Sequence, residues 1–165
     1  IAMRISDVIE YSPTRESFIK SLGKFNVATL EEMSSLYLHD FGKELKNSNI
    51  EVSAFIDPIN NQIQCSKEIG FDCIELHTGT YSELKGQEQE NELQKLIEAS
   101  YFASDLGLIV NAGHGLNYQN VLKIASIYNI NELNIGHSIV SRALAVGLEQ
   151  SVREMKILIS NHYLK

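Results

Sequence analysis

The segment 111–116, which reads Asn-Ala-Gly-His-Gly-Leu and directly follows an apolar run, holds the residue types best suited to chemistry. Glycines flank His114, so the backbone can approach a ligand closely while an imidazole and free N–H groups face it. The same pattern also fits a tight turn that carries a surface histidine. Local sequence does not decide between a catalytic loop and such a turn.

A second segment, 134–138, reads Asn-Ile-Gly-His-Ser and runs from the end of a predicted strand into the start of a predicted helix. Backbone N–H groups at a helix N-terminus, reinforced by the helix dipole, bind an anion without any basic side chain. In barrels of alternating strands and helices the phosphate site commonly lies between the last two strand-to-helix loops. These two segments are the last such loops of the chain, so they support one another as a phosphate site.

Glu75 lies in the run Cys-Ile-Glu-Leu-His-Thr, on the polar side of a predicted strand. A carboxylate there can act as a base, relay a proton or stabilise a developing cation, with its pKa raised by burial. A structural ion pair is the simpler alternative. His77, on the same side, is interpreted as a structural histidine. Asp57, which precedes Pro58, fits the N-cap of the next helix at least as well as a catalytic acid, so it is not included in the predicted site.

From residue 50 onward, short β-rich runs alternate with longer helical patterns, which is typical of βα units in a parallel sheet. Strands are predicted at Glu51–Asp57, Cys73–Thr78, Leu108–Ala112 and Glu132–Gly136. Helices are predicted at Thr29–Lys46, Asn91–Leu106, Tyr118–Ile127 and Ser138–His162, the last with Ser138 as its N-cap. No linker divides the chain, so we expect a single domain over residues 1–165.

The alternation within the strands favours a barrel over an open sheet. In the run that starts at Cys73, Ile74 and Leu76 form an apolar face while Glu75 and His77 lie opposite, and the other predicted strands divide in the same way. Strands of a doubly wound sheet are apolar on both faces, whereas a barrel can gather a polar layer inside its rim. The predicted class is therefore α/β, a TIM (β/α)8 barrel. Eight units take about 250 residues, so mainly the C-terminal half is expected here.

The composition excludes several classes of protein. A net charge of -7 without any cluster of Lys and Arg argues against a nucleic-acid partner but permits small phosphorylated substrates. No apolar run reaches the roughly 20 residues of a membrane span, and no signal sequence is evident, so we expect a cytoplasmic protein. Cys65 and Cys73 form no C-x-x-C pair and are interpreted as reduced packing residues. The cysteines therefore do not indicate a zinc or redox site.

Together, the strand ends resemble those of the pyridoxine 5'-phosphate synthase family. The resemblance covers about Ile50 to Lys165 and rests on motifs that occur in the family's order: Phe-Ile-Asp at 55–57, Ile-Glu-Leu-His-Thr-Gly at 74–79, Val-Asn-Ala-Gly-His-Gly-Leu at 110–116 and Glu-Leu-Asn-Ile-Gly-His at 132–137. The resemblance implies a TIM barrel, assembled as a homo-octamer. It also implies condensation of 1-deoxy-D-xylulose 5-phosphate with 3-amino-2-oxopropyl phosphate, without metal or organic cofactor.

The resemblance also implies roles for individual residues. His114 would be the proton donor, and Gly115 beside it would bind substrate. Gly136 and His137 would hold a phosphate. Glu75 would be the carboxylate that stabilises the transition state.

The N-terminal side departs from the family. The family's Asn on the first strand, His and Arg on the second and Glu on the third have no counterpart here, and residues 1–3 resemble those that follow that Glu. The family's mobile loop is replaced by residues 19–23, so we expect these 165 residues alone not to catalyse the condensation. Two alternatives stay open: another phosphosugar barrel, such as an isomerase or epimerase, and a non-catalytic phosphate-binding subunit.

Overall fold

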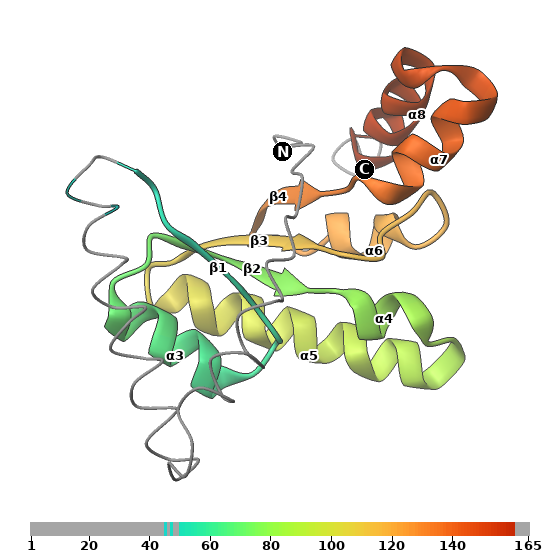
Figure 1. Ribbon diagram of the computed structural model, residues 1–165. Coiled ribbons are helices and arrows are strands. Elements are labelled where there is room, and N and C mark those ends of the chain that lie inside the picture. The colour runs from blue at the N-terminus through green and yellow to red at the C-terminus, as the bar shows by residue number, and fades with distance from the viewer. Residues whose placement is uncertain (1–44, 46, 48–49, 161–165) are drawn as a thin grey trace, which may run out of the picture.

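The structure, a computed structural model, describes residues 50–160 together with positions 45 and 47 (Figure 1). Within these residues strands and helices alternate. The strands are β1 (Ser53–Ile56), β2 (Cys73–His77), β3 (Ile109–Gly113) and β4 (Ile130–Asn134). The helices are α3 (Asn60–Ile69), α4 (Gly79–Glu83), α5 (Gly86–Asp105), α6 (Val121–Ala125), α7 (His137–Val146) and α8 (Leu148–Ser160).

The strands form a parallel sheet in the order β1-β2-β3-β4, which is also their order along the chain. All three pairings are parallel, so the carboxyl ends of the strands meet at one edge. The register places Phe55 beside Glu75, Glu75 beside Asn111, and Asn111 beside Glu132. A polar row of Glu75, Asn111 and Glu132 thus crosses β2, β3 and β4, with Phe55 beside it on β1. All four predicted strands are confirmed, with ends that differ by at most two residues.

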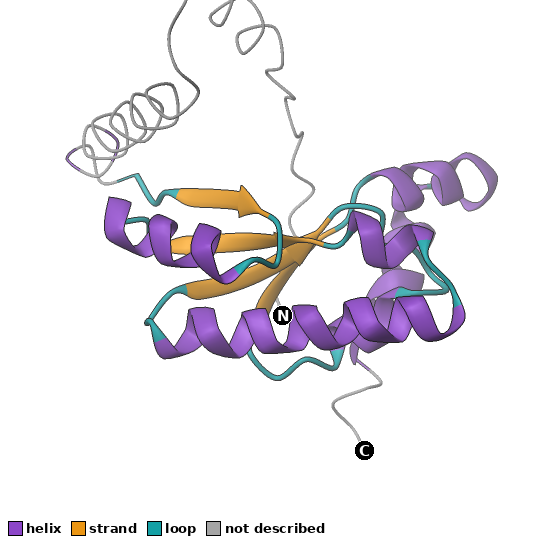
Figure 2. Cartoon of the chain, turned by 90° about the horizontal axis from the view of Figure 1, so that it is seen from below, coloured by secondary structure: helices purple, strands orange, loops and turns teal. Residues whose placement is uncertain are grey.

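The opposite face of the sheet forms the core. Ile74, Leu76, Val110 and Leu133 are almost completely buried. They belong to one apolar cluster with residues of the helices, among them Ile63 of α3, Leu96 of α5, Ile124 of α6, Ile139 of α7 and Met155 of α8. The long helix α5 runs along the strands (Figure 2). Strand alternation therefore sends the apolar side chains to the helices and leaves the polar phase on the other face, as the sequence predicts.

The predicted helix Ser138–His162 is wrong as a single element. The chain forms α7 and α8 instead, separated at Gly147, whose backbone has φ 84° and ψ 155°. A residue with a side chain does not adopt this conformation readily, so the helix ends there although the helical spacing of apolar residues continues. Gly136 occupies the N-cap position of α7, and Ser138 lies inside the first turn.

Other predicted bounds also change. The helix predicted at Asn91–Leu106 starts earlier, at Gly86, and the one predicted at Tyr118–Ile127 is reduced to Val121–Ala125. Cys73 is buried and free, but Cys65 is exposed, so its interpretation as a packing residue is wrong. The helix predicted at residues 29–46 lies outside the described residues, except for position 45.

Candidate active site

His114 begins the loop that follows β3, and its backbone is strained. Its φ is +78°, and that of Gly115 is +76°, so consecutive residues are left-handed. Histidine tolerates this region better than most side chains, yet such a conformation persists only where its surroundings hold it. The hydroxyl of buried Thr78 lies 2.7 Å from the carbonyl oxygen of Gly113 and 2.6 Å from that of His114. These contacts fix the loop to the end of β2.

Glu75 lies on the polar face of β2, against Gly113. A Cβ atom at Gly113 would lie 2.1 Å from Glu75 Oε1, so the absence of a side chain there makes room for the carboxylate. Asn134 Nδ2 donates a 2.6 Å hydrogen bond to Glu75 Oε2. Burial raises the pKa of the Glu75 carboxyl, Glu132 raises it further, and the Asn134 hydrogen bond and His77 lower it in part. The group therefore holds a proton more readily than a solvated carboxyl.

The side-chain amide of Asn134 is only partly satisfied by its hydrogen bond to Glu75. Its Oδ1 atom is buried and has no hydrogen-bond partner among the described residues. A buried polar atom left in this state costs about 1–3 kcal/mol. Sequence reasoning did not assign Asn134 a role, although its place on the polar phase of β4, across from Glu75, was the available signal.

The second predicted loop lies beside the first. α7 begins at His137, which is exposed, and Ser138 Oγ donates a 2.8 Å hydrogen bond to the carbonyl oxygen of Leu116. This contact joins the loop after β4 to the loop that carries His114 and Gly115. A Cβ atom added at Gly136 would meet nothing within 4 Å, so open space adjoins the start of the helix. The sequence-predicted residues of the two loops are thus neighbours.

Asp57 and His77 complete this edge of the sheet. Asp57 is not a helix N-cap, since α3 has Ile59 in that position. Its Oδ1 atom instead lies 3.2 Å from His77 Nδ1. The ring of His77 lies 4.8 Å from that of His114, measured between centroids. Local sequence could not reveal a pair that lies 20 positions apart.

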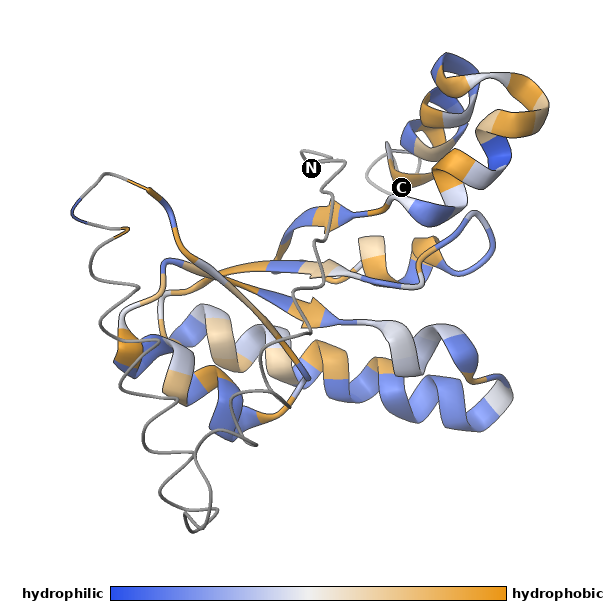
Figure 3. Cartoon of the chain, viewed as in Figure 1, coloured by the Kyte–Doolittle hydropathy of each residue, from blue (hydrophilic) through white to orange (hydrophobic). Residues whose placement is uncertain are grey.

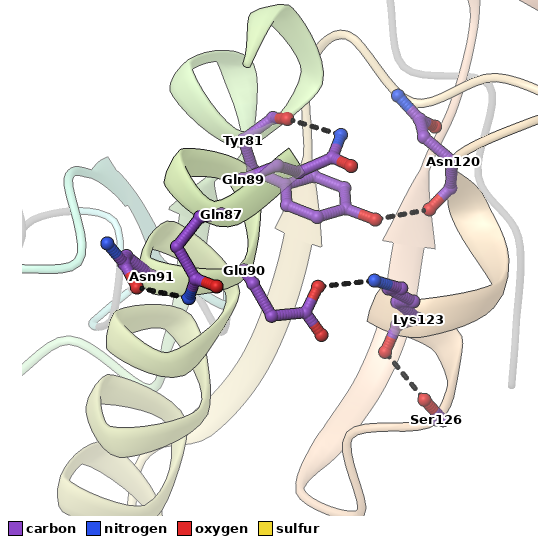
Figure 4. A network of polar contacts seen from close by, with 8 residues as sticks. All are labelled: Tyr81, Gln87, Gln89, Glu90, Asn91, Asn120, Lys123 and Ser126. Atoms are coloured by element: carbon purple, nitrogen blue, oxygen red, sulfur yellow. Dashed lines mark hydrogen bonds and ion pairs between the residues drawn. The ribbon is translucent and has the colours of Figure 1, made fainter. Parts of the chain in front are cut away.

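A network of polar contacts joins α4, α5 and α6 around Asn120, which lies at the end of the His114 loop (Figure 4). The hydroxyl of Tyr81, on α4, donates a 2.8 Å hydrogen bond to the carbonyl oxygen of Asn120, and Lys123 of α6 pairs with Glu90 of α5. Asn120 in turn donates through Nδ2 to the carbonyl oxygen of Gly115, at 3.2 Å. The loop is therefore anchored at both ends.

The described residues assemble Glu75, His114, Gly115, Gly136 and His137 along the carboxyl edge of three neighbouring strands, β2, β3 and β4. No group of three or more His, Cys, Asp and Glu side chains that could hold a metal ion occurs in this part of the chain. The helices of residues 50–160 include none long and apolar enough to span a bilayer. The carboxyl edge of the sheet therefore carries the imidazole of His114, the carboxyl of Glu75 with its raised pKa, and the N-terminus of α7.

Comparison with known proteins connects this arrangement to a family. A family model described as "Pyridoxal phosphate biosynthesis protein PdxJ" matches residues 15–161, a longer stretch than the motifs alone covered. The chain is similar to pyridoxine 5'-phosphate synthases from Prochlorococcus marinus subsp. pastoris (64% identity over 94% of this chain), Thermodesulfovibrio yellowstonii (45% over 96%) and a Synechococcus species (43% over 98%). It spans 64% of the length of each of these relatives.

Proposed function

This chain belongs to the PdxJ family of pyridoxal phosphate biosynthesis proteins, and from that premise we propose that the protein carrying it is a pyridoxine 5'-phosphate synthase. The proposed reaction condenses 1-deoxy-D-xylulose 5-phosphate with 3-amino-2-oxopropyl phosphate, closes the pyridine ring, and releases inorganic phosphate and water. The observation that carries the proposal is the convergence of Glu75 and His114 with the Gly136–His137 loop at the carboxyl edge of the sheet. Parallel sheets bind substrates at that edge.

We propose further that the sheet is part of a TIM (β/α)8 barrel within a single domain. Two features support this. The strands follow one another in the sheet as they do in the chain, whereas the strand order of a doubly wound sheet reverses at a switch point. The described helices share one apolar core with one face of the sheet, and the polar row lies on the other. A barrel places such a row inside its mouth.

Acid–base groups of the required kinds are present. Ring closure expels water, which leaves only after the departing oxygen gains a proton, and exposed His114 would donate it. The substrate amine condenses with a ketone to give a cationic iminium. Ionised Glu75, held by Asn134, would lie beside that cation and stabilise it. Because its pKa is raised, the same carboxyl would also exchange a proton more readily than a solvated one.

The substrate phosphate would bind at the start of α7. The first N–H groups of a helix lack partners within it and attract anions, and α7 begins directly after Gly136 and runs for 10 residues. Gly136 leaves space for the anion, His137 can donate to it, and Gly115 lies in the adjoining loop. The contact between Ser138 and Leu116 would couple phosphate binding to the position of the His114 loop.

We also propose that the protein self-associates, as a homo-oligomer. Its support is a set of apolar side chains exposed on α7 and at the start of α8: Val140 (54%), Leu144 (88%) and Leu148 (54%). Figure 3 shows hydrophobic residues in orange along both of these helices. Large exposed apolar side chains that gather on one surface are typical of contacts between proteins. Sedimentation velocity would then give a mass above that of one chain.

The reaction is tested on the intact gene product that carries this chain. With both phosphorylated substrates, we expect pyridoxine 5'-phosphate and inorganic phosphate in equal amounts. The variant His114→Asn removes the proton donor and should lower kcat by about 100- to 10,000-fold. Gln119→Ala, an exposed change on the same loop, is the control and should keep the wild-type rate.

Different results identify the alternatives. Phosphate binding without product, in both wild type and His114→Asn, would replace the synthase with a non-catalytic phosphate-binding subunit. Isomerisation or epimerisation of the sugar phosphate alone would indicate a different phosphosugar barrel enzyme. Equal rates in wild type and His114→Asn would refute the role assigned to the imidazole.

A further inference from the structure

Two side chains from the end of β1, Asp57 and Phe55, contact His77. Asp57 Oδ1, at the end of β1, lies 3.2 Å from its Nδ1 atom. The ring of Phe55 meets it edge-on, with centroids 5.1 Å apart and an interplanar angle of 86°. The His77 side chain is nevertheless 28% exposed, so the packing of the core does not explain this arrangement.

The acceptor in this contact fixes the chemical form of the His77 ring. An ionised carboxylate can only accept a hydrogen bond, so Nδ1 of His77 must carry the proton. In the neutral ring Nε2 then bears the lone pair. An Asp–His pair of this kind holds an imidazole in one tautomer and one orientation. No hydrogen bond to Nε2 occurs among the described residues.

The His77 ring also contacts the ring of His114. Their ring centroids are 4.8 Å apart, with an interplanar angle of 49°. The ring nitrogens of His114 form no hydrogen bond within the described part of the chain, and its side chain is exposed. The orientation of the His114 imidazole therefore depends on its strained backbone and on its ring contacts with His77 and, at 6.2 Å, Phe55.

Gly79 makes room for both rings. A Cβ atom at this position would lie 2.6 Å from His77 Nε2 and 3.1 Å from His114 Cδ2. Such a contact with His77 is closer than atoms can approach, so any side chain would displace the rings. Because Gly79 has no side chain, the rings of His77 and His114 can both pack against the backbone at the start of α4.

From these contacts we propose that Asp57 and His77 are positioning residues for His114, an inference that rests on the proposed function. Asp57 fixes the tautomer and orientation of His77, and the His77 ring then holds the His114 imidazole toward the substrate. Neither residue needs to touch the reacting atoms. A misplacement of about 1 Å in a catalytic group can cost on the order of 100-fold in rate, so the effect falls on kcat.

The central variant is Asp57→Asn, which keeps the shape of the side chain and removes its charge. Because Asp57 is 55% exposed, the substitution should not prevent folding. We expect kcat to fall about 10- to 100-fold while KM changes less than about 3-fold. Asp105→Asn, the same chemical change at the exposed end of α5, is the matched control and should leave both constants unchanged.

A second variant separates packing from polar positioning. His77→Phe keeps an aromatic ring beside His114 but cannot pair with Asp57. If the pair orients the ring, His77→Phe should lose kcat to about the same extent as Asp57→Asn, and the double variant should be no worse than either single one. Wild-type kcat in Asp57→Asn would overturn the proposal, as would full activity in His77→Phe.

Imidazole NMR spectra of the same protein test the geometry without turnover. The nitrogen signals of neutral His77 should report the Nδ1–H tautomer, and Asp57→Asn should remove that preference and shift the ring protons of His114. Unchanged signals would overturn the inference even in an active enzyme. An inactive wild type that shows the expected NMR changes would instead refute the proposed function and leave the positioning contact standing.

Discussion

At the scale of single residues, the Glu75 carboxyl makes stability depend on pH. Burial raises its pKa above the ordinary value of 4.5, and the hydrogen bond from Asn134 offsets this only in part. The folded protein therefore binds this proton more tightly than the unfolded chain does. The contribution of Glu75 to stability is full below the ordinary pKa and is lost as pH rises through the raised pKa of the folded state.

The variant Glu75→Gln should remove this dependence. Glutamine has nearly the same size, stays neutral, and its carbonyl oxygen can accept the hydrogen bond from Asn134. Relative to wild type, the free energy of unfolding of the variant should therefore increase as pH rises from about 4 to about 8. Urea denaturation of both proteins over a series of pH values measures this difference in the free energy of unfolding.

The same substitution at exposed Glu83, on α4, serves as the control for this series. A difference between Glu75→Gln and wild type that stays constant over the whole pH range would contradict the raised pKa of Glu75. A difference that changes in the opposite direction would indicate that the Asn134 hydrogen bond outweighs burial.

Single residues also show how far the site could be predicted. The polar phase of the strands located Glu75 correctly, because alternation alone determines which face a strand residue joins. It could not reveal that Asp57 meets His77, since that contact depends on the pairing of β1 with β2. The local motif of an acidic residue before a proline fitted a helix N-cap at least as well as a catalytic acid, so Asp57 was not included in the predicted site.

At the scale of elements, strands were predicted more accurately than helices. A strand that is apolar on one face shows its period within a few residues, and turns limit it on both sides. The apolar period of the last helices continues across Gly147, with Val146 before it and Met155 after it in phase. The sequence therefore indicated one helix where the backbone of a single glycine makes two.

This interruption makes a testable prediction. At a backbone of φ 84° and ψ 155°, Gly147→Ala introduces strain and should lower the free energy of unfolding by about 1–3 kcal/mol. Ala145→Gly, in the last turn of α7 and also exposed, should lower it by at most about 1 kcal/mol, because glycine loses more backbone entropy than alanine in a helix. Both substitutions are measured by chemical denaturation.

The sign of the stability change at position 147 distinguishes a helix broken at Gly147 from one continuous helix. In one continuous helix, Gly147→Ala would stabilise the protein by about 1 kcal/mol, since alanine is the better helix former. If Gly147→Ala stabilises the protein, the single helix predicted from the sequence is correct and the break at Gly147 is wrong. Loss of stability at both positions agrees only with a break between α7 and α8.

At the scale of the whole molecule, a phosphate bound at the loop ends should stabilise the entire fold. The His114 loop is joined to α7 through Ser138 and Leu116, to α4 through Tyr81 and Asn120, and to β2 through Thr78. A ligand that binds only the folded state raises the free energy of unfolding by about 2.7 kcal/mol at a concentration of 100 times its Kd. Inorganic phosphate is the simplest such ligand.

Thermal unfolding of the intact gene product should therefore show a Tm that rises with phosphate concentration, beyond the effect of chloride at equal ionic strength.

The variant Gly136→Ala tests whether this phosphate binds at the start of α7. Its φ of -117° is accessible to alanine, and the added Cβ would meet nothing within 4 Å, so the fold should tolerate it. If the anion binds in the open space beside Gly136, the added methyl group would compete with it for that space. We expect the variant to keep the wild-type Tm in chloride and to lose the rise with phosphate. If the rise persists, phosphate binds elsewhere, and the role assigned to Gly136 and His137 is wrong.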